Sequence, residues 1–488
     1  MEETVTISKE AHKIFLDQEQ KIIFLQQQLD ELKRLIFGSK RERFVSVADD
    51  QASLFDFGPQ QQEVLSKREQ ITYERAKAEK KKPVRLFLPS HLERRKEIIE
   101  PKDVPADAKK IGDEVTEILE YTPGSLFVRA IIRPKFALAQ DKGIVIAELP
   151  SLPIPKSNAG ASVLSHIIVS KFVDHLPFYR QLKQFKRQDV VVAESTIGDW
   201  FNQGCHLLEP LYDTLVKNIR SQNYLQADES PIKVQDNHKK GTTHTGFMWV
   251  YHSPQTKQVC FDYRSSRSRE GPEVFLESFE GTLQTDGYTA YNKLAQQGKI
   301  TLTACMAHAR RKFDKALDND KARAEYVLAL MQQLYAAEAK ARDENLSHHQ
   351  RYELRLQISK PLVDELELWL RENILQVLPK SSIGMAITYS LNLWPRLKKY
   401  LDEGKLEIDN NRIENTIRPL ALGRKNYLFA GSHSAAQRAA MAYSLMGTCL
   451  LNGVEPFSWL TKTFEVLRET KTSQLHTLLP GFSEKEST

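Results

Sequence analysis

The order of strands and helices between residues 224 and 304 constrains the fold of this chain more than any other feature. Runs of β-branched and aromatic residues predict strands, whereas apolar residues spaced three and four apart predict helices. On this basis we predict strands at 224–227, 245–251, 259–263, 282–285 and 300–304, a helix at 271–279 and a short helix ending at residue 294. Three successive strands followed by strands that alternate with helices indicate an antiparallel meander joined to parallel strands through helical crossovers.

This order is that of a ribonuclease-H-like α/β sheet, within a chain long enough for several domains. The chain has 488 residues, and a typical domain has about 150. Residues 309–405, which follow the last strand, are rich in Ala, Leu, Glu and Arg and show no strand alternation, so we predict an all-α insertion there. The predicted fold class is therefore multi-domain α/β.

Two acidic residues stand where predicted strands of this sheet end. Asp228 follows the first strand in LQADES, and Asp286 follows the fourth in LQTDGY. Because adjacent strands bring such ends together, the two carboxylates can share a site, and a cation between them would relieve their repulsion. Oxygen ligands suit Mg²⁺ or Mn²⁺, and two such ions about 4 Å apart stabilise an in-line displacement at phosphorus. Simpler explanations remain open, because Asp228 can merely end a strand and Asp286 with Gly287 can form a turn.

A third carboxylate, Glu414, lies in the stretch IDNNRIENTIRPLALGRKN after the helical insertion. The stretch has neither the apolar spacing of a core helix nor the alternating charges of a solvent-exposed helix face. As an alternative, Glu414 three residues after Asn411 fits a capping box, where it would bond a backbone N–H. Pro419 either ends this helix early or kinks it.

Basic residues gather near these acids, although the whole chain has a net charge of only +6. Such local clusters favour phosphate neutralisation, with scattered surface charge as the alternative. We predict DNA contacts for Lys183, Lys186, Arg187, His308, Arg310, Arg311, Lys312, Arg412, Arg418, Arg424 and Lys425.

The N-terminal part of the chain contains three further patterns. Apolar residues from Phe15 to Ile36 follow a heptad seam of about three heptads, which predicts a coiled coil that pairs two copies, or a lone amphipathic helix packed on its own protein. Alternating residues between 102 and 155 predict a small β-rich unit. Helices predicted at 162–173, 176–187 and 195–204 form either a helix-turn-helix DNA-binding unit, with the last as recognition helix, or a helical spacer.

These patterns together divide the chain into segments. We predict a coiled-coil dimerisation helix (1–45), a linker (46–100), the β-rich unit (101–156), the helix-turn-helix-like unit (157–215), the first part of the sheet domain (216–308), the helical insertion (309–405), the last part of the sheet domain with Glu414 (406–440) and a C-terminal helical tail (441–488).

Composition places the protein in a reducing compartment without a membrane. The four cysteines, Cys205, Cys260, Cys305 and Cys449, lie far apart with no CxxC spacing, which argues against a disulfide framework and a structural zinc site. The N-terminus lacks the apolar core of a signal peptide, and the longest apolar run is too short to span a bilayer. We expect a cytoplasmic protein.

Several blocks of sequence resemble a known family. The chain is similar to the DDE transposases of the insertion sequence 66 type over nearly its whole length, through LIFGSKRERF, SLFDFG, KFVDHLPFYRQ, STIGDWF, QADESP, QTDGYTAY, CMAHARRKF, IDNNRIENTIRPLALGRKNYLFAGS and LNGVEPFSWL. The resemblance implies a ribonuclease-H-like catalytic domain interrupted by a helical insertion. It places Asp228, Asp286 and Glu414 at the motif positions of the three metal-binding acids. A bacterial, nucleoid-associated protein with accessory proteins encoded by the same element is also implied.

One departure from the family concerns zinc. Members commonly carry a small cysteine-rich zinc-binding module before the helix-turn-helix region, but this chain has no cysteine before Cys205. Because a tetrahedral zinc site of the usual kind needs thiolates, we expect the β-rich unit to fold without zinc.

The resulting hypothesis is a transposase that uses two Mg²⁺ or Mn²⁺ ions. It would bind the ends of an insertion sequence, cleave the 3′ strand and join it to target DNA. A ribonuclease-H-like nuclease that cuts without joining, and a DNA-binding protein whose catalytic site has decayed, are the alternatives.

Overall fold

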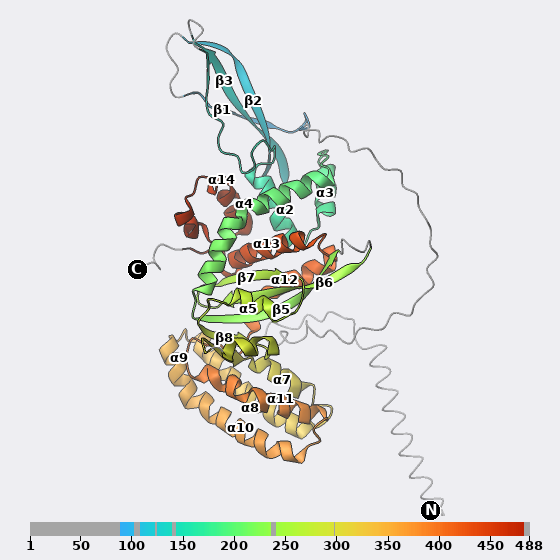
Figure 1. Cartoon of the computed structure of the whole chain (residues 1–488), viewed down its shortest axis with the longest axis vertical. Coiled ribbons are helices and arrows are strands. Elements are labelled where there is room, and N and C mark those ends of the chain that lie inside the picture. The colour runs from blue at the N-terminus through green and yellow to red at the C-terminus, as the bar shows by residue number, and fades with distance from the viewer. Residues whose placement is uncertain are drawn as a thin grey trace, which may run out of the picture. The chain divides into compact units, whose positions relative to one another are not determined.

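The computed structural model describes residues 88–101, 108–122, 124–138, 143–235, 241–296 and 298–482 (Figure 1). These residues belong to one compact unit, 79–488. The predicted coiled coil and most of the predicted linker lie outside the described residues. In the described ranges, every helix is too short or too polar to span a lipid bilayer.

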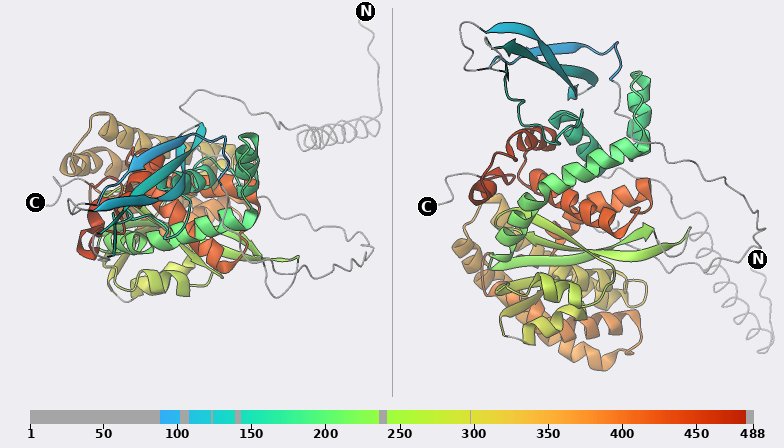
Figure 2. Two further views of the ribbon diagram at one scale, coloured as in Figure 1. Left: turned by 90° about the horizontal axis from the view of Figure 1, so that it is seen from above. Right: turned by 45° about the horizontal axis from the view of Figure 1, so that its top comes forward.

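The first sheet covers residues of the predicted β-rich unit and begins before it. It consists of β1 (Arg94–Ile98), β2 (Lys109–Thr122), β3 (Ser125–Ala137) and β4 (Ile144–Ile146). Strands β2 and β4 are antiparallel to β3, whereas β1 is parallel to it (Figure 2). The linker predicted to end at residue 100 therefore already contains a strand. We missed β1 because its sequence, RRKEI, is almost entirely charged, and four of its five residues are exposed.

Three helices follow this sheet. Helices α2 (Ala161–Phe172) and α3 (Phe178–Arg187) confirm the predicted ones, but α4 (Glu194–Arg220) is 27 residues long, far longer than the predicted recognition helix. Its buried apolar residues continue from Ile197 to Ile219, so one face packs into the core over its whole length. Helix α4 leads almost directly into the second sheet, as the alternative of a helical spacer requires.

The second sheet has the predicted topology. Its strands are β5 (Tyr224–Gln235), β6 (Thr243–Ser253), β7 (Gln258–Arg264), β8 (Gly281–Thr285) and β9 (Ile300–Ala304), in the order β7-β6-β5-β8-β9. Pairing is antiparallel between β5, β6 and β7 and parallel from β5 through β8 to β9. Between the last three strands the chain forms α5 (Glu270–Phe275), the 3₁₀ helix η2 (Thr289–Tyr291) and α6 (Asn292–Gln296).

Strand β5 does not end at residue 227, as we predicted, but continues to Gln235. Beyond Asp228, the buried residues Ser230, Ile232 and Val234 alternate with exposed ones, and all pair with β6. The prediction stopped at the polar cluster around Asp228, because polar residues inside a strand interrupt the pattern on which it depends.

Residues between β9 and α12 form the predicted all-α insertion. It comprises α7 (Met306–Asp314), α8 (Lys321–Asp343), α9 (His348–Leu354), the π-helix η3 (Arg355–Ser359), α10 (Lys360–Asn373), η4 (Ile374–Gln376), α11 (Ser382–Leu397) and η5 (Lys398–Leu401). Its interior holds Glu338, which is paired with Arg351 and with Arg355 at 2.7 Å. Arg351 also pairs with Glu407 at 2.8 Å, so this buried network reaches the segment that returns to the sheet.

Helices α12 (Asn411–Tyr427), α13 (His433–Leu451) and α14 (Pro456–Val466) and the 3₁₀ helix η6 (Thr472–Leu478) complete the chain. Helix α12 continues past Pro419, which therefore does not end it. Helix α13 crosses residue 440, where we predicted the tail to begin. It packs on β7, where Ser444 Oγ accepts a hydrogen bond from the Phe261 N–H at 2.7 Å. Figure 1 shows α13 lying along the sheet.

All four cysteines are buried, and each carries a free thiol. Burial raises the pKa of the Cys205, Cys260, Cys305 and Cys449 thiols, so they stay protonated at neutral pH.

Candidate active site

Strand register brings Asp228 and Asp286 together. In the parallel pair of β5 and β8, Gln226 lies opposite Gln284. Asp228 stands two positions further along β5, and Asp286 is the first residue after β8, so the two aspartates lie near each other where the parallel pairing ends. The sequence spacing of Gln and Asp is the same in LQADES and LQTDGY.

Asp228 is surrounded by other carboxylates. Burial raises the pKa of Asp228 well above its usual value, and the negative charges of Glu229, Asp286 and Glu414 raise it further. One oxygen, Oδ1, accepts a hydrogen bond from the backbone N–H of Glu229 at 2.8 Å. The three predicted acids thus interact electrostatically at one place.

Asp286 also has the turn-forming role that we considered as its simpler explanation. Its Oδ1 accepts a hydrogen bond from the backbone N–H of Tyr288 at 2.8 Å. Gly287 between them has a φ of 95°, a left-handed conformation that favours glycine. The turn holds the Asp286 carboxylate at the end of β8, so the turn does not exclude a role in a site.

Glu414 lies in the first turn of α12 but does not cap it. Asn410 is the N-cap residue, and no side chain caps the helix. The Glu414 Oε2 accepts a hydrogen bond from Arg311 Nη2 at 2.6 Å, whereas its buried Oε1 has no hydrogen-bond partner among the described residues. The capping-box interpretation is therefore wrong.

Helix α7 supplies the two side chains nearest to Glu414. His308 Nε2 lies 3.9 Å from Glu414 Oε1, and Arg311 Nη1 lies 3.3 Å from His308 Nε2. Burial lowers the pKa of His308, and the positive charge of Arg311 lowers it further, although Glu414 acts in the opposite sense. The His308 imidazole is therefore neutral and lies beside the charged Arg311–Glu414 ion pair.

The carboxylates do not converge as a closed cage. In the described part of the chain, no three His, Cys, Asp or Glu side chains are grouped closely enough to hold a metal ion. The positive charge that pairs with Glu414 is Arg311, at 2.6 Å.

Sequence reasoning missed Glu229 and its partner. The Glu229 side chain is buried and forms an ion pair with Arg267, whose guanidinium stacks 4.2 Å above the Tyr288 ring. Burial raises the pKa of Glu229, whereas Arg267 lowers it. The adjacent acids in LQADES could have revealed Glu229. Successive residues of a strand face opposite sides of the sheet, so Asp228 and Glu229 must lie in two different environments.

The predicted DNA-binding residues are spread over three helices. On α7, Arg310 and Lys312 are exposed, and Lys312 Nζ lies 4.5 Å from the centre of the Tyr389 ring. On α12, Arg412 pairs with Glu407 at 3.1 Å, Arg424 donates to the Pro231 carbonyl, Arg418 is half-buried and Lys425 is exposed. On α3, the residues Lys183, Lys186 and Arg187 are exposed.

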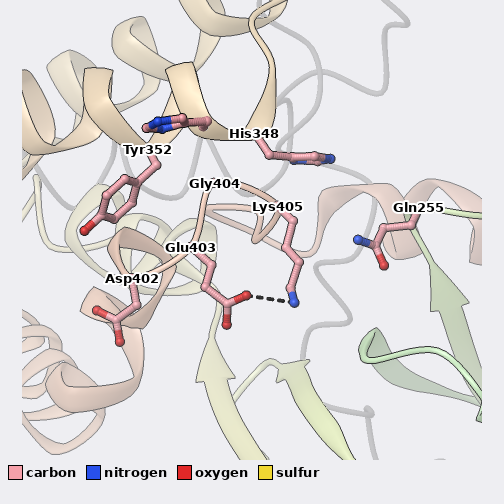
Figure 3. A pocket seen from close by; sticks show the side chains of 8 residues that line it. Gln255, His348, Tyr352, Asp402, Glu403, Gly404 and Lys405 are labelled. Carbon is pink, nitrogen blue, oxygen red and sulfur yellow. Dashed lines mark ion pairs between the residues drawn. The ribbon is translucent and has the colours of Figure 1, made fainter.

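Two cavities lie near this region without including the three acids. One, of about 360 Å³, is lined by Arg412 and Asn415 from α12, together with His252 and Lys257. The other, of about 350 Å³, is shown in Figure 3 and is lined by Gln255, His348 and Tyr352, among others. Its floor contains the Glu403–Lys405 ion pair at 2.7 Å.

Three family models match this sequence. The model described as "Transposase IS66 family" matches residues 156–438, and the "IS66 C-terminal element" matches residues 444–480. A model described as "Transposase C of IS166 homeodomain" matches residues 25–96, where we predicted a coiled coil and a linker.

Similar proteins occur in Sinorhizobium fredii (strain NBRC 101917 / NGR234). Uncharacterized protein y4jD is 33% identical over 416 residues, which cover 81% of this chain and 81% of that protein. Uncharacterized protein y4qI is 32% identical over 476 residues, covering 92% of this chain and 87% of that protein. Uncharacterized protein y4hP is 28% identical over 501 residues, covering 94% and 88%.

Proposed function

This chain belongs to the Transposase IS66 family, and from this premise we propose that it is a DDE transposase acting on DNA. It binds the ends of an insertion sequence, cleaves the 3′ strand at each end and joins the freed 3′-hydroxyl to target DNA. Both reactions are displacements at phosphorus that require positioning and charge stabilisation more than covalent chemistry.

The second sheet supports a ribonuclease-H-like catalytic domain. An antiparallel meander β7-β6-β5 continues into the parallel strands β8 and β9, and the chain returns through the helical insertion to α12. Asp228 lies in β5, Asp286 directly follows the adjacent strand β8, and Glu414 lies in α12, an arrangement that supports this proposal.

The acidic residues suit Mg²⁺ or Mn²⁺ in donor type. Asp228, Asp286 and Glu414 offer hard carboxylate oxygens, and Glu414 Oε1 is a buried acceptor without a partner among the described residues. We propose that these three residues hold two such ions. When bound, the ions activate the attacking oxygen and stabilise the leaving oxygen.

Residues of α7 would neutralise phosphate charge and form hydrogen bonds at the site. Arg310 and Lys312 are exposed on α7, beside the helical turn that carries Arg311, and would neutralise phosphates of the bound strand. The lowered pKa of His308 keeps its ring neutral, so that it can accept or donate a hydrogen bond without adding charge.

The proposal includes a homodimer that forms through residues 1–45 and accessory proteins encoded by the same element. It also includes DNA contacts by three residues of α3, which are Lys183, Lys186 and Arg187.

The environment of Asp228 carries the proposal, because Asp286 and Glu414, from distant parts of the sequence, both raise the pKa of its buried carboxyl. Asp228→Asn keeps the size of the side chain while removing its charge. We expect it to abolish cleavage of DNA carrying the element ends and to leave binding of those ends largely intact.

Cleavage is measured with labelled end DNA and Mg²⁺, and binding by gel shift. Asp262→Asn is the matched control, because Asp262 is also a half-buried acid of the same sheet but pairs with Arg264 at 2.8 Å. Cleavage that survives in Asp228→Asn would refute the site. Precut ends that are never joined to target DNA would favour a nuclease.

A further inference from the structure

Two buried glutamines precede the aspartates of the candidate site. Gln226 and Gln284 are 0% and 1% exposed and lie opposite each other in β5 and β8. Gln226 Nε2 donates to Gln284 Oε1 at 2.8 Å, so the two side chains form one pair beneath the acids. Buried amides must satisfy all their polar atoms, and the remaining partners of this pair therefore show what it does.

The pair binds the backbone of the segment that leads into α12. Gln284 Nε2 donates to the Glu407 carbonyl at 2.8 Å, and Gln226 Nε2 donates to the Asp409 carbonyl at 3.0 Å. The Tyr224 hydroxyl completes the set, because it donates to Gln284 Oε1 at 2.7 Å and accepts from the Glu407 N–H at 3.1 Å. Side chains thus hold this segment in the way a neighbouring strand would.

The orientation of the amides is defined at both ends. Burial lowers the pKa of His252 to about 3, so its ring is neutral. Its Nδ1 lies 3.1 Å from Gln226 Oε1, and because an amide oxygen can only accept, the neutral ring carries its proton on Nδ1. The network from His252 to Glu407 can therefore be satisfied in one arrangement only.

We infer that Gln226 and Gln284 are positioning residues that set Glu414 against Asp228 and Asp286. Glu414 lies five residues after Asp409, in the first turn of α12, and the whole helical insertion separates it from β9. A chain returning from such an insertion needs contacts that restore its register on the sheet. The glutamines supply them two residues before each aspartate, so one pair of strands places all three acids.

This inference rests on the proposed function only in its claim about metal binding; the claim that the glutamines hold the segment before α12 does not depend on it. It is tested in the full chain with Gln226→Met and Gln284→Met, which keep the side-chain length but remove the hydrogen bonds. Gln181→Met is the matched control, since Gln181 is also 0% exposed and donates to the Ile167 and Leu176 carbonyls at 3.2 and 2.9 Å. Tyr224→Phe is a milder variant in case the others fold poorly.

Hydrogen exchange gives a readout that needs no metal. We expect amides of residues 407–414 to exchange about tenfold faster or more in Gln226→Met, Gln284→Met and Tyr224→Phe, because their local opening becomes easier. Gln181→Met should leave these amides unchanged, whatever its melting temperature. Equal exchange in the glutamine variants and the control would overturn the inference.

Calorimetric titration with Mn²⁺ gives the second readout. The Gln226 and Gln284 variants should bind Mn²⁺ about 10- to 100-fold more weakly than the wild type, as loss of supporting contacts does at other metal sites. Faster exchange with unchanged, Asp228-dependent Mn²⁺ affinity would overturn the positioning role. If Mn²⁺ binding by the wild type does not depend on Asp228, the proposed metal site is refuted. Hydrogen exchange of residues 407–414 would then still show whether the glutamines hold this segment.

Discussion

The ion pair between Arg311 and Glu414 gives the most direct test of how the candidate site changes on metal binding. The two side chains are 26% and 11% exposed, and the pair is joined at 2.6 Å. We consider Arg311→Met, which keeps the apolar stem and removes the charge. Breaking a fully buried pair costs about 3–5 kcal/mol, and a hydrogen bond to a charged group contributes about 1.5–3 kcal/mol. Because a quarter of Arg311 remains exposed, we expect a loss of about 2 kcal/mol in the metal-free protein.

Metal should reverse much of this loss. If Glu414 releases Arg311 when it binds a divalent cation, the cation replaces the missing positive charge in the variant. A ligand at 100 times its dissociation constant stabilises the folded state by about 2.7 kcal/mol. The gain should be larger in Arg311→Met than in the wild type, because the variant has no competing guanidinium.

The assay is urea unfolding in EDTA and in Mn²⁺. Arg310→Met is the matched control, because Arg310 is exposed on the same helix and a surface substitution changes stability by no more than about 0.5 kcal/mol. Equal stability of the two variants in EDTA would show that the pair contributes nothing. A difference from the wild type that persists unchanged in Mn²⁺ would refute the exchange of partners at Glu414.

Two further predictions concern pH and the helical insertion. The pKa of Asp228 is higher in the folded protein than in the unfolded chain, so the folded protein binds more protons. The free energy of unfolding in EDTA should therefore fall as the pH rises from the pKa of Asp228 in the unfolded chain to its pKa in the folded protein. Asp228→Asn should flatten this dependence in urea titrations from about pH 4 upward, and an unchanged slope would contradict the assignment. Glu338→Gln should destabilise the protein by about 3–5 kcal/mol in urea unfolding, because it leaves Arg351 and Arg355 buried without their full counter-charge. The exposed Glu325→Gln should change the midpoint little, and equal effects would mean that the buried network adds no stability.

The sequence alone determined most of the local elements and singled out the acids that we propose for the site. Strand alternation and helical spacing are local properties, so they predicted the order of the second sheet, its antiparallel and parallel pairing and the all-α insertion. The acids of LQADES and LQTDGY could be singled out because polar residues are conspicuous beside apolar strands. The predicted end of β5 was wrong because the polar residues around Asp228 interrupt the apolar pattern, although the strand continues to pair with β6. The predicted length of α4 was wrong because its apolar face continues to pack into the core as far as Ile219.

Only the tertiary structure decided how these acids are held. The sequence allowed Glu414 to be a cap or a metal ligand, and it did not predict the hydrogen bond with Arg311, 103 positions away along the chain. The role of Gln226 and Gln284 depended on which backbone atoms their amides reach across the insertion. No local periodicity records such contacts, because they join residues whose distance in space is set by packing and not by spacing along the chain.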